Sequence, residues 1–275
     1  MTEAILPHVV VGARPERLCL MLHGILGSKS NWRSFARRWS EALPGWGFVL
    51  ADLRNHGDAQ GFAPPHTMAA VAADLARLCA SLDAPVELVA GHSFGGKSAL
   101  CLAARDDAPP LKGVLLLDAN PGVRPAEPGA EETLAVLDSL DAVGARFARR
   151  QDFIDAMRAR GHTPGLATWL AMNLAHEGDA LVMRLDVASI RAMLVDYFAT
   201  DLWPTIESGA APPIRVLAGG RSSVFTQEDV ARARRAAEAH PATRSVEVID
   251  DAGHWLHVDA PDAVSAWVLA KLKET

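Results

Sequence analysis

The sequence predicts an α/β fold in which helices cover both faces of a mostly parallel, twisted sheet and an inserted helical segment forms a cap. Short apolar runs alternate with stretches of helical periodicity, and this alternation stops at Pro121 and resumes at Pro213. With 275 residues, 49% of them hydrophobic, the chain suits one domain with an insertion. We therefore expect a core of residues 1–120 and 213–275 and a cap of residues 121–212.

Six short runs, most of them apolar throughout, predict the strands of the sheet. A continuous apolar run is typical of a strand that is buried on both faces. Because helical stretches separate most of these runs, the strands are expected to be parallel. The predicted strands are residues 18–22, 47–51, 86–90, 113–117, 214–218 and 245–249.

Apolar residues at helical spacing predict the helices that cover the sheet. Pro44-Gly45 ends the first of them, and Thr67 is a suitable N-cap for the second. The predicted helices are residues 31–43, 66–82, 93–105, 227–239 and 261–273.

The insertion shows helical spacing and no pattern of a strand. Helices are expected at Phe153 to Met157, Leu166 to Leu174 and Ile190 to Phe198. Because the insertion follows the carboxyl end of a strand, where open α/β sheets place ligands, we interpret it as a cap over a site. Its large apolar residues are expected mostly in the cap core, with a few lining an acyl pocket: Trp169, Met172, Met183, Tyr197, Phe198 and Trp203.

Composition and charge disfavour several classes of function. The formal net charge of −6 argues against nucleic acid as a partner, since phosphate binding needs a basic surface. No apolar run is long enough to span a membrane, and Met1 to Ala4 lacks the basic start of a secretion signal. Widely spaced Cys19, Cys79 and Cys101 predict reduced core thiols. We expect a cytoplasmic monomer or homodimer.

A nucleophile is predicted at Ser93, in the segment Gly91-His92-Ser93-Phe94-Gly95. A G-x-S-x-G pentapeptide alone is a weak signal, but this one lies between a predicted buried strand and a predicted helix. That context is typical of a nucleophile elbow, which holds the serine Oγ exposed above the sheet. The two glycines have no Cβ, so neighbouring chain can pass closely. The competing interpretation, a serine that only caps a helix, fits this context poorly.

A serine nucleophile needs a general base, and His254 is the best placed of the ten histidines. It follows the last predicted strand, at the sheet edge that also carries the elbow. His257 is the main competitor, but we expect it to begin the last helical segment or to pack locally. Structural hydrogen bonds are expected for three histidines that flank glycines: His23, His56 and His92.

The base in turn needs an acid that fixes its tautomer and stabilises the imidazolium. Asp118 directly follows the strand of residues 113–117 and therefore lies at the same sheet edge. The chain order Ser93, Asp118, His254 matches the order of nucleophile, acid and base in α/β-hydrolases.

An acyl-transfer site also needs N–H donors for the developing oxyanion. The residue after the nucleophile, Phe94, offers one backbone N–H at a helix N-terminus. The second donor is expected from the loop after the first buried strand, His23-Gly24-Ile25-Leu26. Ile25 is our choice for that donor, and Leu26 is the alternative.

These motifs resemble those of the serine hydrolases with the α/β-hydrolase fold, over nearly the whole chain. Within that fold the resemblance is strongest to the YbfF-type esterases and the related abhydrolase-domain proteins. It rests on the elbow followed by Gly96-Lys97 and on these segments: His23-Gly24, Asp52-Leu53-Arg54-Asn55-His56-Gly57, Leu117-Asp118, Gly219-Gly220-Arg221-Ser222 and Gly253-His254-Trp255. The resemblance implies hydrolysis of carboxylic esters, with acyl-CoA thioesters as a further substrate class.

One position departs from the common pattern of this fold. Many α/β-hydrolases carry the acid three residues after a glycine that follows the strand beyond the cap, and Ser222 stands there. A serine supplies no negative charge at neutral pH, so we expect the acid at Asp118 and Ser222 as an auxiliary hydrogen-bonding partner of His254. Asp250 and Asp251 are interpreted as residues of a turn or solvated loop.

We therefore expect a serine esterase that takes a small-molecule ester or thioester through an acyl-enzyme on Ser93. No metal-ligand cluster or dinucleotide motif is apparent, and this mechanism needs no cofactor and no metal. Two alternatives stay open. A C–C bond hydrolase or perhydrolase would use the same elbow, and a non-catalytic ligand-binding homologue would keep the pocket without the reaction.

Overall fold

The computed structural model describes residues 4–124, 128–210 and 212–275. Residues 1–3, which contribute to the expected absence of a secretion signal, lie outside the described residues, as do 125–127 and 211 of the predicted cap. In the described part of the chain, no helix is both long and apolar enough to cross a membrane.

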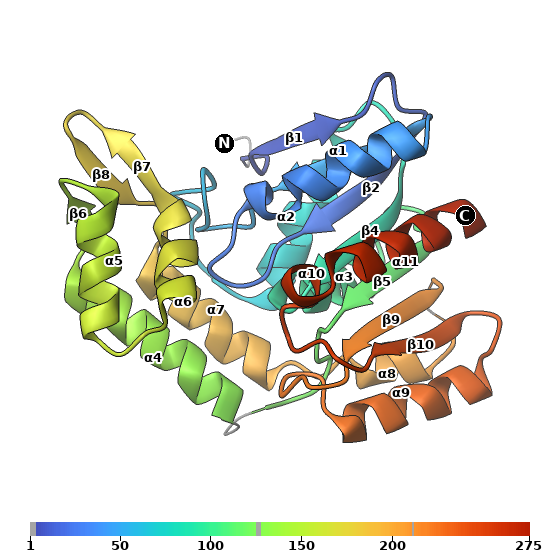
Figure 1. The fold of residues 1–275 in the computed structure, drawn as a ribbon. Coiled ribbons are helices and arrows are strands. Elements are labelled where there is room, and N and C mark those ends of the chain that lie inside the picture. The colour runs from blue at the N-terminus through green and yellow to red at the C-terminus, as the bar shows by residue number, and fades with distance from the viewer. Residues whose placement is uncertain (1–3, 125–127, 211) are drawn as a thin grey trace.

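A seven-stranded sheet lies at the centre of the described molecule (Figure 1). The strand order is β1-β3-β2-β4-β5-β9-β10, and all neighbouring strands are parallel except β1 and β3. All six predicted strands are present. The sequence analysis missed β1, a four-residue edge strand too short to carry a clear pattern. The bounds are β1 His8–Val11, β2 Arg17–Leu22, β3 Trp46–Ala51, β4 Val86–His92, β5 Gly113–Leu117, β9 Ile214–Gly219 and β10 Arg244–Ile249.

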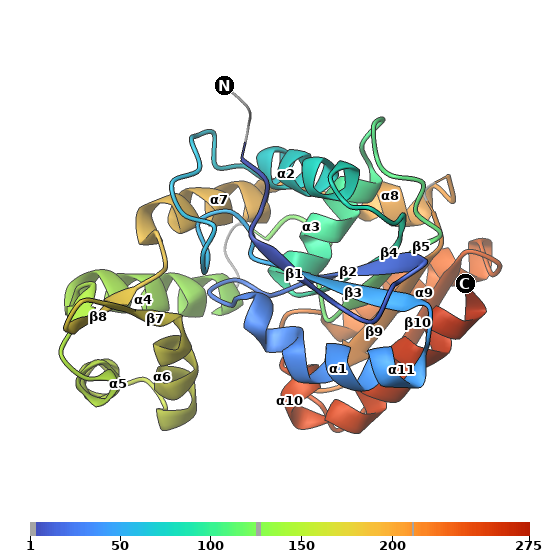
Figure 2. The same cartoon turned by 90° about the horizontal axis from the view of Figure 1, so that it is seen from above.

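Helices cover both faces of the sheet, as Figure 2 shows from above. Alternate side chains of β2 enter two separate cores, which explains why the strand is apolar throughout: Cys19 and Met21 on one face, Leu18, Leu20 and Leu22 on the other. The first face packs on α1 (Arg33–Ala42) and α11 (Pro261–Glu274); the second packs on α2 (Met68–Ala80), α3 (Phe94–Ala103) and α9 (Gln227–Ala239).

Short helical turns complete the core part of the chain. The 3-10 helix η1 (Lys29–Trp32) leads into α1, and α10 (Leu256–Asp259) precedes α11. The predicted helix bounds therefore hold to within a few residues, and that of α9 agrees at both ends.

From Pro128 to Ala199, the inserted segment lies to one side of the large sheet in Figure 1. Its last helix, α8, packs on the core through an Arg232–Glu207 ion pair of 2.6 Å and through Trp203 against Phe225. The division of the chain into core and cap stays our prediction. The helices are α4 (Pro128–Val143), α5 (Arg150–Ala159), α6 (Pro164–Leu170), η2 (Ala171–Asn173), α7 (Val187–Ala199) and α8 (Trp203–Glu207).

The expectation that the insertion contains no strand is wrong. An antiparallel sheet of order β6-β8-β7 is formed by Arg146–Phe147, Ala180–Met183 and Leu174–Glu177. Leu174, expected on a helix, begins β7. The signal that could have found this hairpin is its two-residue turn, Gly178-Asp179, since a Gly-Asp pair between two short runs is typical of a tight hairpin.

Candidate active site

The elbow places Ser93 between β4 and α3 in a strained conformation, with φ 53° and ψ −120°. A Cβ on Gly91 would lie 2.3 Å from the carbonyl carbon of Gly95, and one on Gly95 would lie 2.5 Å from the His23 oxygen. Only glycine fits at these two positions, so the spacing of the pentapeptide follows from the tightness of the turn.

Ser93, His254 and Asp118 are brought together as predicted. The Nε2 atom of His254 lies 3.1 Å from the Ser93 Oγ, and its Nδ1 lies 2.7 Å from Asp118 Oδ2. Asp118 is fully buried. Because the ionised carboxylate only accepts, Nδ1 carries the proton and the Nε2 lone pair faces the serine hydroxyl. This is the tautomer that a general base requires.

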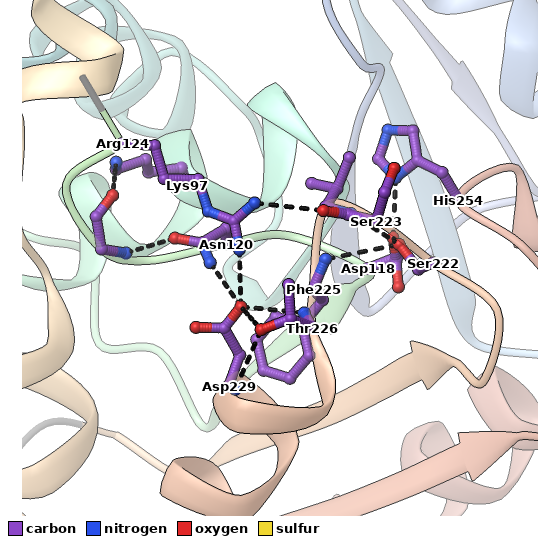
Figure 3. Close-up of polar contacts among 12 residues, drawn as sticks. Lys97, Asp118, Asn120, Arg124, Ser222, Ser223, Phe225, Thr226, Asp229 and His254 are labelled. Atoms are coloured by element: carbon purple, nitrogen blue, oxygen red, sulfur yellow. Dashed lines mark hydrogen bonds and ion pairs between the residues drawn. The ribbon is translucent and has the colours of Figure 1, made fainter. Parts of the chain in front are cut away.

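The Asp118 carboxylate is held from three sides. The backbone N–H of Gly219, at the end of β9, donates to Oδ1 at 2.9 Å. The Ser222 hydroxyl donates to Oδ2 at 2.5 Å, beside the His254 contact (Figure 3). Asp118 itself has a φ of 46°, a conformation rare outside glycine. The acid is thus fixed at the junction of β5 and β9.

Ser222 differs from the expectation. Its hydroxyl contacts Asp118 and no hydrogen bond joins it to His254 in the described residues. The same Oγ accepts backbone N–H groups of Val224 at 3.0 Å and Phe225 at 3.3 Å, which fixes the direction in which its proton points. Among the described residues, Ser222 is therefore linked to His254 only through the Asp118 carboxylate.

Two other histidines, His92 and His257, pack near His254. His92 Nε2 donates to the carbonyl oxygen of His254 at 2.8 Å and so holds the backbone of that residue. His257 lies in α10 and packs against Trp32 and His92, as expected of a locally packed residue. Burial lowers the pKa of His257 to about 4 and also lowers that of His92, so both are neutral at pH 7.

His23 and His56 have the structural hydrogen bonds that were predicted. The Leu53 N–H donates to His23 Nε2 at 3.0 Å, and His56 Nδ1 donates to the Arg54 carbonyl at 2.9 Å. Burial lowers the pKa of His56 to about 3. The His23–Leu53 contact joins the loops after β2 and β3, and so braces the segment that carries the expected oxyanion donor.

The expected oxyanion donors lie beside the nucleophile. Ile25, Leu26 and Phe94 all line the same cavity as Ser93. Within the described residues, no hydrogen bond is found from the backbone N–H of any of the three. The Leu26 carbonyl accepts from Asn173 Nδ2 at 2.9 Å, which ties this loop to the inserted segment. Both Ile25 and Leu26 stay open as the second donor.

The cavity above Ser93 has a volume of about 390 Å³ and a mostly apolar lining. Of the six cap residues named from sequence, Trp169, Tyr197 and Phe198 line it, whereas Met172 is 57% exposed. The other lining residues are Gly24, Ile25, Leu26, His92, Ser93, Phe94, Arg124, Glu132, Thr133, Val136, Leu166, Leu194, Ser223, Val224, His254 and Trp255.

Sequence reasoning missed a polar cluster at one end of this cavity, centred on Asp229 (Figure 3). Asp229 Oδ2 accepts from Arg124 at 2.6 Å, from Asn120 at 2.8 Å and from the Thr226 N–H at 2.8 Å. The signal for part of it is the Thr226-x-x-Asp229 capping box of α9. The cluster joins the loop that follows Asp118 to the loop that contains Ser222.

A parallel sheet with a serine elbow, and with an acid and a histidine after later strands, defines an α/β-hydrolase. The model of the alpha/beta hydrolase family matches residues 19–267, and the chain belongs to this family.

Relatives with curated descriptions cover most of the chain. It is 27% identical over 255 residues to the sn-1-specific diacylglycerol lipase ABHD11 of Xenopus tropicalis, covering 90% of this chain and 75% of that relative. It is 26% identical to the esterase YbfF of Escherichia coli, covering 89% of both chains. A solved structure titled marine microorganism esterase superposes with a TM-score of 0.81 at 24% identity, covering 97% of this chain and 98% of that chain. That structural likeness establishes the shared fold.

Proposed function

We propose that the protein is a serine hydrolase of carboxylic esters that forms an acyl-enzyme on Ser93. The observation that carries the proposal is the continuous hydrogen-bonded series from Ser93 Oγ through His254 to Asp118, at the floor of a mostly apolar cavity. Its curated relatives named lipase and esterase support the same reaction class.

In the proposed reaction, Ser93 Oγ attacks the acyl carbon while His254 Nε2 takes its proton. Asp118 stabilises the imidazolium, which then protonates the leaving alcohol or thiol. Water, activated by His254, attacks the acyl-enzyme and releases the acid and free Ser93. The backbone N–H of Phe94 and that of Ile25, or of its neighbour Leu26, hold the oxyanion in both tetrahedral intermediates.

The test is Ser93→Ala, measured with p-nitrophenyl esters and with a fluorophosphonate probe that labels activated serines. We expect turnover to fall by about 10⁴-fold or more and labelling to disappear, while circular dichroism is unchanged. Ser40→Ala, on α1 away from the cavity, is the matched control and should keep both signals. Turnover retained in Ser93→Ala would remove the serine from the mechanism.

The same two assays separate the alternatives. A folded protein that takes no probe would be a ligand-binding homologue. Labelling of Ser93 without turnover of any ester or acyl-CoA thioester would favour a C–C bond hydrolase or perhydrolase. The apolar lining favours small to medium apolar acyl groups, and a series of chain lengths measures that preference.

Neither a metal nor a cofactor takes part in the proposed reaction. Among the described residues, no group of three or more His, Cys, Asp or Glu side chains is placed to hold a metal ion. We also propose a cytoplasmic location and a monomeric or homodimeric state. The location is supported by three free thiols: Cys19 and Cys79 are buried and Cys101 is half-buried.

A further inference from the structure

Lys97, four residues after the nucleophile, is a fully buried cation that the proposed reaction does not use. Within the described residues it forms no ion pair with a carboxylate, and burial lowers its pKa to about 8. Burying an ammonium group is costly unless its donors are satisfied. The hydrogen bonds of the Lys97 ammonium therefore show which segments of the chain it joins.

The Lys97 ammonium joins helix α3 to the start of the inserted segment and to the last turn of α7. Nζ donates to the Gly122 carbonyl at 2.8 Å, where the insertion begins, and to the Tyr197 carbonyl at 2.6 Å, near the end of α7. Figure 3 shows Lys97 beside the segment that carries Asn120 and Arg124. One side chain thus fixes two chain segments that are far apart in sequence.

The Tyr197 carbonyl belongs to the last turn of α7, whose carbonyl groups have no partners further along the helix. Three successive carbonyl oxygens of this turn accept hydrogen bonds from nearby donors. The Asp196 oxygen accepts from Thr200 N–H at 2.9 Å, and the Phe198 oxygen accepts from the Arg124 N–H at 2.8 Å. The Tyr197 oxygen accepts from Lys97, and a cation at a helix C-terminus also suits the helix dipole.

The helix end that Lys97 holds is also a wall of the cavity. Tyr197 and Phe198 both line it. The Tyr197 ring lies 4.4 Å from Lys97 Nζ, within the range of a cation–π contact, and 5.5 Å from the Phe94 ring. The position of this wall relative to Ser93 therefore depends on contacts made by α3.

We propose that Lys97 is a positioning residue that fixes the α7 wall of the acyl pocket relative to Ser93 and so sets the acyl-chain length that the pocket accepts. The substrate part of this inference rests on the proposed ester hydrolysis. The structural part, the fixing of α7 by Lys97, is independent of any reaction.

The test compares Lys97→Met with the wild type by two readouts. Hydrogen–deuterium exchange should become about tenfold faster in peptides spanning residues 187–200, because the last turn of α7 loses its hold. With p-nitrophenyl acetate and octanoate, the ratio of the two kcat/KM values should change by about fivefold or more, mainly through KM. The kcat for acetate should stay within about twofold, since an acetyl group is too short to depend on the α7 wall.

Lys273→Met, at an exposed position on α11, is the matched control and should change neither readout. Unchanged exchange and an unchanged ratio in folded Lys97→Met would overturn the proposal, as would an equal loss of kcat for both esters. If the methionine variant fails to fold, Lys97→Gln removes the charge with less apolar bulk and faces the same two criteria. A wild type without ester turnover would refute the proposed function, and exchange would still decide whether Lys97 fixes α7.

Discussion

One oxygen atom, Asp118 Oδ2, accepts both the His254 Nδ1–H and the Ser222 hydroxyl. The two hydrogen bonds share the negative charge of one oxygen atom, so each is weaker than it would be alone. Together they fix the orientation of the carboxylate, and with it the orientation of the imidazole. Because Asp118 is fully buried, no water can replace either contact without a rearrangement. The two donors differ in their further contacts, since the His254 ring also contacts Ser93 and the Ser222 hydroxyl does not.

We expect Asp118→Asn to lower kcat by about 10⁴-fold, because the amide disfavours the tautomer that leaves Nε2 free to accept a proton. Ser222→Ala should lower kcat by about tenfold, the effect of losing one hydrogen bond to a charged group. The measurement is kcat for p-nitrophenyl butyrate in folded variants. Similar losses in both, or no loss in Asp118→Asn, would assign the acid elsewhere.

The convergence of Ser93, Asp118 and His254 could be predicted because each follows a strand, and parallel strands bring their carboxyl ends to one edge. The partner of Ser222 could not. The N–H groups of Val224 and Phe225 donate to the Ser222 Oγ, which leaves its proton to point at Asp118. That direction depends on the conformation of a loop, which the residue types alone do not determine.

At the scale of elements, the N-terminus of α9 supports the site through Asp229. We expect Asp229→Ala to lower the free energy of unfolding by about 2 kcal/mol, because it removes the capping box and the half-buried carboxylate paired with Arg124. Chemical denaturation measures the loss. Glu228→Ala, an acidic residue in the same turn, is the control and should cost less than about 0.5 kcal/mol. Equal losses would mean that helix-dipole effects alone explain Asp229.

Helices and strands with a strong hydrophobic pattern could be predicted from the sequence. Very short strands could not, because a few residues do not form a recognisable pattern. Strand β2 is apolar at every position after Arg17 because both faces are buried, and α9 is bounded by a capping box. The edge strand β1 and the hairpin β7–β8 have four residues per strand, and their stability comes from partners distant in sequence or from a turn. The same limit applies to Lys97, whose partners lie 25 and 100 residues further along the chain.

At the scale of the whole molecule, buried neutral histidines make stability depend on pH. Burial lowers the pKa of His56 to about 3 and that of His257 to about 4, and it also lowers those of His23 and His92. In the unfolded chain the ordinary pKa is about 6.5. Between these values the unfolded chain binds more protons, so the free energy of unfolding falls as the pH is lowered through 6.5 towards the folded values.

We expect the free energy of unfolding to drop between pH 7.5 and pH 5, with about 2 kcal/mol of the loss due to fully buried His56. Urea denaturation at the two pH values is the measurement. Carboxylates with ordinary pKa values titrate mostly below pH 5, so they contribute little to the change in stability between pH 7.5 and pH 5. His257→Phe, which cannot be protonated, should show a smaller loss than the wild type. Equal stability at both pH values would contradict the burial of these imidazoles.

The order of the triad along the chain has a practical consequence. Ser93 and Asp118 precede the insertion and His254 follows it, and the exposed hairpin turn at Gly178 lies between them. A chain cut there gives two fragments, neither of which contains all three residues. Their reassembly depends on β9 pairing with β5 across the break. Fusing the fragments to two interacting proteins would therefore convert the proposed ester hydrolysis into a colorimetric reporter of that association.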